Sequence, residues 1–364
     1  MKVEGRWRRA IEPVDGGAAV VVLDQARLPY AIGWQRLADL DAAAAAIRDM
    51  TIRGAPLIGA TAAWGVALAM RADATDAGLE RARAVLAATR PTAINLRWAL
   101  DRMHGVLAPL APSARADAAV AAAQAIADDD VAQCEAIGRH GAAVIRAAAE
   151  RLGGARPVRV LTHCNAGWLA TVDWGTAIAP IYKAHEDGVA VEVWVDETRP
   201  RNQGMLTAWE LVQHGVPHTV IADNQGGHLM QRGEVDLCIV GTDRTTRNGD
   251  VCNKIGTYLK ALAAKDNGVP FYAAVPSPSI DWTVGEPHEI PIEERGAEEV
   301  RFVAGRDADG RPARVEVVPP GSAVANAAFD VTPRRLMTGL ITERGIAAPS
   351  ADGLAALFPE HARR

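Results

Sequence analysis

The second half of the chain alternates short β-rich runs with segments that can hold a helix, and this pattern limits the fold more than any other feature. The β-rich runs are VRVLTHC (158–164), VEVWVDE (191–197), HTVIADN (218–224), DLCIVGTD (236–243) and PFYAAV (270–275). Most of the gaps are long enough for a helix, although the gap before DLCIVGTD is shorter. Strands that alternate with helices form a parallel sheet covered on both faces. We therefore predict a Rossmann-like, doubly wound α/β domain.

The first 150 residues differ from the second half in their residue pattern. One early apolar run, AAVVVLD (18–24), predicts a strand of a small antiparallel sheet, and the stretches after it are rich in Ala and Leu, which favour helix. The segment GGARP (153–157) breaks this pattern. We predict a mainly helical domain over 1–152 and the Rossmann-like domain over 153–364. The uncharged stretch 54–70 is interpreted as a buried helix rather than a membrane span.

Composition narrows the functional classes. Hydrophobic residues make up 49% of the chain and charged residues 23%, as in an ordinary globular protein. The net charge is −5 with no basic run, which argues against nucleic acid or an anionic membrane as the partner. No signal peptide is evident, and the four cysteines are scattered without a CxxC pair. We expect a reducing, cytoplasmic location.

Polar residues follow four of the predicted strands. The clusters are His163-Cys164-Asn165, 196–199 (DETR), Asp223-Asn224 and 241–244 (GTDR). Because ligands bind outside the carboxyl ends of strands in open α/β sheets, we expect these clusters to line one crevice.

The usual cofactor motifs are missing from this crevice. No GxGxxG follows the first strand and no GxxxxGK[ST] occurs, so the sequence disfavours NAD, FAD and P-loop nucleotides. His214 and His218 are separated by Gly215 and Pro217 and cannot share a helical face, and no Cys/His set has zinc-ligand spacing. We predict neither a cofactor nor a metal.

An anion is a better candidate ligand. Arg53 and Arg90 each precede a proline that can begin a helix, and free N–H groups at a helix start favour an anion. Two ordinary helix starts with solvated arginines would look the same. Cys164 is the candidate reactive thiol, although a structural cysteine is the more frequent case. Asp243 follows an apolar strand that should raise its pKa towards that of a general acid, and a helix-capping Asp is the alternative. Together these groups would suit proton or hydride transfer on a sugar phosphate.

Six segments, in order, resemble the 5-methylthioribose-1-phosphate isomerase family of methionine salvage. They are RGAPLIGATAAWG (53–65), RPTAINL (90–96), THCNAG (162–167), VDETRPRNQG (195–204), GTDRTTRNGDVCNKIGTY (241–258) and IPIEERGAEEV (290–300). The resemblance covers about residues 45–345. The family is related to the regulatory subunits of the translation initiation guanine-nucleotide exchange factor and to archaeal ribose-1,5-bisphosphate isomerase.

The resemblance implies a helical N-terminal domain with a small sheet, a Rossmann-like C-terminal domain, a homodimer, and catalysis without cofactor or metal. It implies that Cys164 and Asp243 are the catalytic pair, with Asp243 as the acid at the ring oxygen and Cys164 as a base or a transition-state stabiliser. The implied substrate contacts are Arg53, Gly54, Ala55, Arg90, Gln203, Asn253 and Lys254. Cys252 departs from the family, which commonly has a small apolar residue there.

Three alternatives to this function stay open. Ribose 1,5-bisphosphate would need a further basic cluster for its second phosphate, whereas a methylthio group needs an apolar pocket. Trp34, Trp64 or Trp168 could line such a pocket, but tryptophans more often lie in a core. An isomerase for 5-deoxyribose 1-phosphate is the second alternative, because pockets discriminate weakly among small apolar groups. A non-catalytic relative that binds a nucleotide or sugar phosphate is the third, and loss of the Cys or the Asp would mark it.

Overall fold

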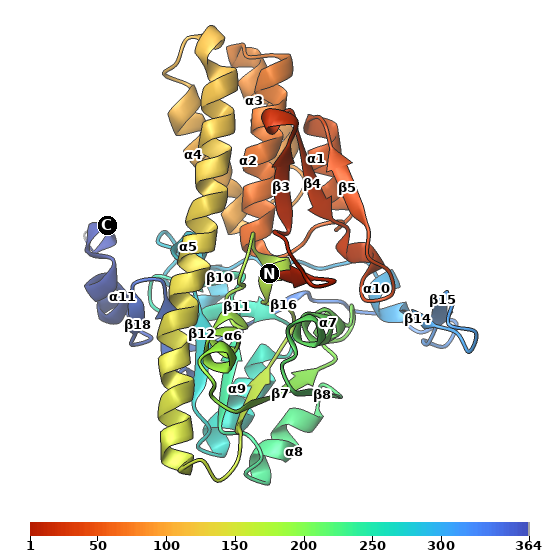
Figure 1. Ribbon diagram of the computed structural model, residues 1–364, viewed down its shortest axis with the longest axis vertical. Helices are drawn as coiled ribbons and strands as arrows, with labels where there is room; N and C mark the ends of the chain where they lie inside the picture. The colour runs from red at the N-terminus through yellow and green to blue at the C-terminus, as the bar shows by residue number, and fades with distance from the viewer. Residues whose placement is uncertain (363–364) are drawn as a thin grey trace.

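The computed structural model describes residues 1–362 and divides into an upper helical region and a lower sheet region (Figure 1). The upper region contains the hairpin β1 (Lys2–Val3) and β2 (Arg6–Trp7) and one antiparallel three-stranded sheet. The three strands of that sheet are β3 (Ile11–Val14), β4 (Ala19–Leu23) and β5 (Trp34–Leu37). The small antiparallel sheet predicted from AAVVVLD is confirmed.

Five helices complete the upper region: α1 (Leu40–Arg48), α2 (Ala55–Ala72), α3 (Asp76–Ala87), α4 (Ile94–Leu107) and α5 (Pro112–Leu152). Helix α2 is long and apolar enough to cross a membrane, but 83% of its residues are buried inside the protein. Its small residues allow close packing; Gly59, for example, lies against the backbone of Asn95. The prediction of a buried helix is therefore confirmed.

Helix α4 begins later than the sequence suggested. Pro91 was expected to begin a helix, but residues 90–93 form a turn in which the Ala93 N–H donates to the Arg90 carbonyl at 3.0 Å. The helix starts only at Ile94. The prediction that a helix begins at Pro91 is therefore wrong, so Arg90 does not stand beside a helix N-terminus, whereas Pro56 does lie in the first turn of α2.

The lower region is built on a seven-stranded sheet with the order β18-β17-β12-β9-β6-β7-β8. All neighbouring pairs are parallel except β17 and β18. The strands are β6 (Val158–Thr162), β7 (Val191–Asp196), β8 (His218–Ile221), β9 (Leu237–Val240), β12 (Phe271–Ala274), β17 (Gly339–Thr342) and β18 (Gly345–Ala347). The five predicted β-rich runs correspond to the parallel strands β6, β7, β8, β9 and β12.

Helices cover both faces of this sheet. One apolar core joins the sheet to α5, α6 (Ala179–Glu186) and α7 (Gly204–His214). A second core lies on the other face under α8 (Gln225–Gln231), α9 (Thr257–Asp266) and α11 (Ala351–Leu357). The predicted doubly wound α/β fold is confirmed. Helix α5 runs along the whole molecule in Figure 1, and its second half packs on α6, where Gly141 leaves room for Pro180. The division of the chain at 152 and 153 stays a prediction.

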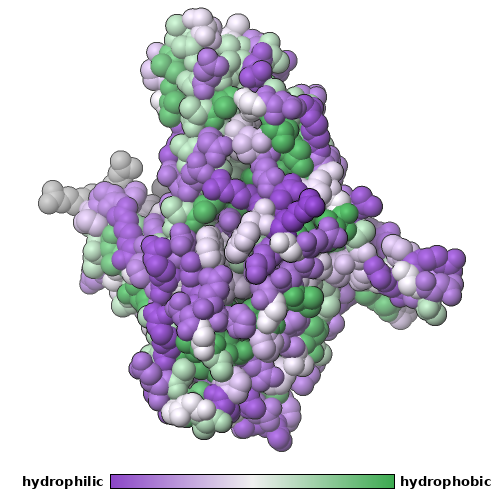
Figure 2. All heavy atoms as spheres, viewed as in Figure 1, coloured by the Kyte–Doolittle hydropathy of each residue, from purple (hydrophilic) through white to green (hydrophobic). Residues whose placement is uncertain are grey.

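A second, four-stranded sheet joins the two regions. Its order is β13-β10-β11-β16, with β10 (Arg244–Thr246), β11 (Val251–Lys254), β13 (Ile280–Asp281) and β16 (Phe329–Thr332). The short helix α10 (Glu298–Arg301) leads to the hairpin of β14 (Phe302–Arg306) and β15 (Pro312–Glu316). This hairpin projects from the side of a largely hydrophilic face (Figure 2).

Short 3₁₀ turns complete the described chain: η1 (Asp15–Gly17), η2 (Gln25–Arg27), η3 (Trp168–Ala170), η4 (Ser277–Ser279), η5 (Pro287–Glu289), η6 (Arg334–Leu336) and η7 (Pro359–His361). The turn η3 matters for function, because it belongs to the loop that follows β6 and packs against the start of α2.

Candidate active site

A cavity lies where the carboxyl ends of β6 and β9 meet the start of α2 and the four-stranded sheet. Its lining includes all nine residues that the sequence predicts as catalytic residues or substrate contacts. They are Arg53, Gly54, Ala55, Arg90, Cys164, Gln203, Asp243, Asn253 and Lys254. Residues from both halves of the chain therefore form one site.

The start of α2 supplies one wall of the cavity. Gly54 precedes the helix with a positive φ of 93°, and a Cβ at this position would overlap the backbone of Ala170. Only glycine suits both the conformation and the close approach. The free N–H groups of the first helical turn thus lie beside the cavity, where the positive end of the helix dipole favours an anion.

Arg53 adds a buried cation to this wall. Its guanidinium donates hydrogen bonds to the backbone carbonyl and the side-chain oxygen of Asn165, and the residue is only 6% exposed. Among the described residues, the buried Arg53 Nε has no hydrogen-bond partner. Since buried donors are normally paired, this N–H is available to a ligand in the cavity. The interpretation of Arg53 as a solvated arginine is excluded.

Cys164 follows β6 and has an unusual backbone. Its φ of 67° lies in the left-handed region, which non-glycine residues adopt rarely. The Cys164 N–H donates to the Thr198 hydroxyl at 2.8 Å, and the Cys164 carbonyl accepts from the Thr207 hydroxyl at 2.8 Å. Burial raises the pKa of the Cys164 thiol above its usual value, while the nearby Arg53 and Lys254 cations oppose this rise. The thiol is therefore mostly protonated at neutral pH.

Asp243 lies three residues beyond the end of β9, in the connection to β10. Its backbone N–H donates to the Cys252 carbonyl at 2.9 Å, which fixes the chain beside β11. Burial raises the pKa of the Asp243 carboxyl, and the Lys254 cation is the strongest opposing influence. No described residue hydrogen-bonds to the carboxylate, so it is free to exchange a proton with a ligand. This differs from the capping role considered as the alternative.

Further cations surround the pair. The Lys254 ammonium donates to the Ala328 carbonyl at 2.9 Å and lies over the Phe329 ring. Burial lowers the pKa of Lys254. Arg90 and Arg295 share the carboxylate of Glu293, at 3.0 and 3.1 Å. With Arg53, the cavity is thus lined by four basic side chains, which can donate charge-assisted hydrogen bonds to a phosphate.

Arg295 and Asn165 are site residues that the sequence analysis did not assign. Arg295 is within the segment IPIEERGAEEV that carried part of the resemblance, and Asn165 adjoins Cys164 in the polar cluster after the first strand. Their position within these segments is the feature of the sequence that could have identified them as site residues. The tryptophans do not line the cavity: Trp64 and Trp168 are buried in the core. The apolar part of the lining comes instead from Met50, Ile58 and Phe329.

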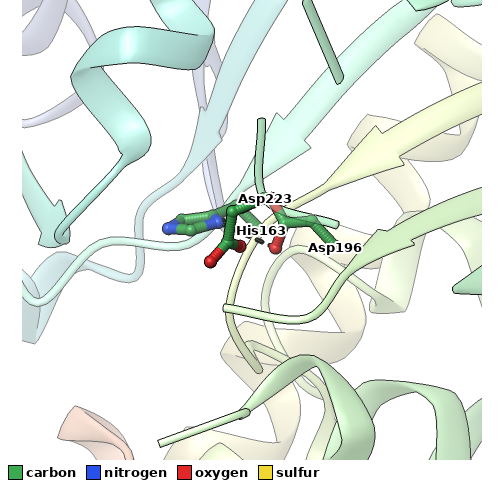
Figure 3. Close-up of side chains that lie close together, drawn as sticks. All are labelled: His163, Asp196 and Asp223. Carbon is green, nitrogen blue, oxygen red and sulfur yellow. Dashed lines mark hydrogen bonds and ion pairs between the residues drawn. The ribbon is translucent and has the colours of Figure 1, made fainter. Parts of the chain in front are cut away.

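One group of side chains near the site has the composition of a metal centre. Figure 3 shows His163, Asp196 and Asp223 with their ligand atoms facing one another. The Lys260 ammonium, however, lies 2.7 Å from Asp196, and the His163 Nδ1 lies 2.8 Å from the same carboxylate. Asp223 accepts from the backbone N–H groups of Thr198 and Arg199. Because the Lys260 cation already pairs with Asp196 and the ligand atoms of the group are engaged in hydrogen bonds, we interpret it as a structural ion-pair cluster.

Comparison with known proteins identifies the family. The profile of the Initiation factor 2 subunit family matches residues 51–349. A methylthioribose-1-phosphate isomerase of Methylorubrum populi is 66% identical over 362 residues, which is 99% of each chain. The crystal structure of 5-methylthioribose 1-phosphate isomerase from Pyrococcus horikoshii OT3 matches with a TM-score of 0.82 and 38% identity, over 98% of this chain and 97% of that one.

A second solved structure carries a different name. The translation initiation factor eIF-2B, subunit delta, from A. fulgidus matches with a TM-score of 0.80 and 36% identity, over 97% of this chain and all of that one. Identity to the Methylorubrum populi isomerase is much higher, at 66% over 99% of each chain. The chain therefore belongs to the methylthioribose-1-phosphate isomerases of the Initiation factor 2 subunit family.

Proposed function

We propose that this protein converts 5-methylthioribose 1-phosphate into 5-methylthioribulose 1-phosphate, with Asp243 and Cys164 as its catalytic residues. The observation that carries the proposal is the composition of the cavity: one thiol and one carboxyl of raised pKa beside four basic side chains. The relatives named methylthioribose-1-phosphate isomerase support the choice of substrate.

Binding of the phosphate is assigned to the basic side chains and the start of α2. Arg53 and Arg90 each have a buried Nε without a partner among residues 1–362, so both can donate to phosphate oxygens. Gln203 likewise has a buried, unpartnered Oε1 in the cavity lining, which can accept from a sugar hydroxyl. Met50, Ile58 and Phe329 offer apolar surface to the methylthio group.

Opening of the sugar ring is assigned to Asp243. The phosphate ester on C1 leaves no free hydroxyl there whose proton could be lost, so the C1–O4 bond breaks only when O4 gains a proton. A carboxyl whose pKa is raised by burial holds that proton at higher pH than a solvated Asp does. Asp243 gives its proton to O4 and becomes a carboxylate, which Lys254 stabilises.

Transfer of hydrogen from C2 to C1 can follow two routes. In the proton route, the minor thiolate form of Cys164 takes the C2 proton as C1=C2 forms. The resulting thiol returns a proton to C1, while the C2 hydroxyl gives its proton to the Asp243 carboxylate, which thereby regains the proton that it gave to O4. In the hydride route, the C2 hydrogen moves to C1 with its electron pair, Cys164 stabilises the charge that develops, and the C2 hydroxyl gives its proton to the Asp243 carboxylate to leave the ketone. A substrate deuterated at C2 separates them, because only the proton route allows label to exchange with water.

Turnover of three substrates tests the function. The purified protein is supplied with 5-methylthioribose 1-phosphate, 5-deoxyribose 1-phosphate or ribose 1,5-bisphosphate, and ketose formation is measured. We expect the highest kcat/KM for the methylthio sugar and a smaller value for the deoxy sugar. Loss of one small apolar group from a substrate typically lowers kcat/KM by about 10- to 200-fold. Higher kcat/KM for the bisphosphate would contradict the assignment. Phosphate-dependent binding without turnover of any of the three would favour a regulatory function.

A further inference from the structure

The hydroxyl of Thr198 occupies a central place beneath the active site, and neither the proposed mechanism nor the substrate contacts use it. Thr198 follows β7, is completely buried and does not line the cavity. Its φ of 57° is in the left-handed region, which is especially unfavourable for a β-branched residue. Such conformations persist only where the surroundings hold them, and they gather at functional sites.

Hydrogen bonds of its backbone and of its hydroxyl fix Thr198 in this conformation. Its N–H donates to Asp223 at 2.7 Å, and its hydroxyl donates to Asp196 at 2.6 Å. Because the hydroxyl has only one proton, its lone pairs remain to accept the Cys164 N–H at 2.8 Å. The Asp196 carboxylate is in turn held by the Lys260 ammonium at 2.7 Å and by His163. The Thr198 hydroxyl oxygen that accepts from the Cys164 N–H is therefore fixed in position, and its proton points towards Asp196.

The left-handed backbone of Cys164 is itself strained, and its N–H donates to the Thr198 hydroxyl. Without that acceptor the buried N–H would be unpaired, and the backbone at Cys164 would relax towards the extended region that L-residues prefer. Such a change of φ would turn the side chain away from its present direction into the cavity. The two left-handed residues are thus coupled by one hydrogen bond.

We propose that Thr198 is a positioning residue whose hydroxyl, oriented by Asp196, holds the left-handed backbone of Cys164 and so directs its thiol into the cavity. The importance of this direction for turnover rests on the proposed function, in which Cys164 acts at C1 and C2. The direction of the thiol itself does not depend on the reaction, so this part of the proposal can be tested without turnover.

The test replaces the hydroxyl without changing the shape of the side chain. Thr198→Val keeps the β-branched form, so it adds no backbone strain, and Thr198→Ser keeps the hydroxyl. Thr332→Val is the matched control, because Thr332 is equally buried and its hydroxyl has no partner within residues 1–362. Each variant is assayed for kcat and KM with 5-methylthioribose 1-phosphate. Alkylation of Cys164 by iodoacetamide is followed by mass spectrometry of the peptide that contains it.

We expect Thr198→Val to lower kcat by about 10- to 100-fold, as for a misplacement of roughly 1 Å, with KM within about threefold because the basic side chains stay in place. The alkylation rate of Cys164 should fall as well. Thr198→Ser should restore both values, and Thr332→Val should leave both unchanged. If Thr198→Val folds poorly, Thr198→Ala removes the same hydroxyl with less strain at positive φ and should show the same two losses.

Two results would overturn the proposal: an unchanged alkylation rate in Thr198→Val or Thr198→Ala, or a Thr198→Ser variant as impaired as the valine variant. A wild-type protein that does not turn over the substrate, but in which alkylation responds to the variants as expected, would refute the proposed function and support the positioning of the thiol.

Discussion

Cys164 and Asp243 share one electrostatic environment, so a change in one charge should alter the reactivity of the other. Burial raises the pKa of both groups, while Lys254 lowers both and Asp243 raises that of Cys164. The active site therefore holds a neutral thiol near a carboxyl that retains its proton unusually well. A dianionic substrate at the basic side chains would disfavour ionisation of the thiol further.

Alkylation of Cys164 measures this coupling. Removing the cation in Lys254→Met raises the thiol pKa further, so less thiolate is present at a given pH and iodoacetamide should react about 2- to 10-fold more slowly at pH 8. Removing the anion in Asp243→Asn lowers the thiol pKa, and the reaction should be faster by a similar factor. Mass spectrometry of the Cys164 peptide gives both rates. Changes in the same direction for the two variants would contradict the account.

The loop between β6 and α6 is held together by one buried side chain and positions several residues of the site at once. Glu210 of α7 is completely buried and accepts from Asn165, from Tyr182, and from the backbone N–H groups of Trp168 and Leu169. Asn165 in turn holds Arg53. The loop that begins with the thiol thus also fixes the cation at the start of α2.

A methyl group at Gly167 should disrupt this loop. A Cβ there would overlap the Glu210 carboxylate, so Gly167→Ala must displace that carboxylate from its hydrogen bonds or shift the loop or α7. We expect a loss of about 1 to 3 kcal/mol in the free energy of unfolding and a marked loss of activity. Gly105→Ala, on the open face of α4, is the control and should stabilise the protein by about 0.5 to 1 kcal/mol. Chemical denaturation measures both, and equal stabilities would be inconsistent with the close packing described.

Helix α5 carries a buried carboxyl that makes stability depend on pH. Asp130 accepts from the Val172 N–H at 2.7 Å, and burial raises its pKa from 3.8 to about 7. Between these values the folded protein holds a proton that the unfolded chain has released. The free energy of unfolding should therefore fall as pH rises from about 4 to 7, by up to about 1.4 kcal/mol per pH unit.

The variant Asp130→Asn isolates this contribution, because the neutral amide can still accept from Val172. His214, whose pKa burial lowers to about 4, acts in the opposite sense by losing stability as pH falls below 6.5. The difference between wild type and Asp130→Asn cancels the His214 contribution. Denaturation at pH 4.5 to 7.5 should show a less negative slope for the variant, and parallel curves would contradict the prediction.

At the scale of the whole molecule, local sequence patterns predicted the fold well. The β-rich runs became parallel strands because most of their apolar residues are buried on the two faces of the sheet, with Val220 of the edge strand β8 as an exposed exception. The strand-end clusters converged because parallel strands end at one edge. Pro91 could not be placed from sequence, because the turn over residues 90–93 is held partly by a distant side chain, Arg244, which donates to the Thr92 carbonyl at 2.6 Å.

The candidate site was predicted less completely than the fold. Its nine residues came partly from the resemblance, and the structure brings them together in one cavity. Arg295 was not assigned because nothing local distinguishes it from other arginines; only folding brings it to Glu293 and the cavity. The role of Thr198 likewise depends on contacts between strands that the sequence does not reveal. The homodimer implied by the resemblance stays a prediction.

Turnover of 5-methylthioribose 1-phosphate by four proteins tests the central claim most directly: wild type, Cys164→Ser, Asp243→Asn, and Cys134→Ala, which replaces a buried cysteine of α5 as a control. We predict ketose formation by wild type and control, and a loss of at least about 10²-fold in kcat for each site variant, with thermal unfolding unchanged. Wild-type rates in either site variant would contradict the assignment of the catalytic pair.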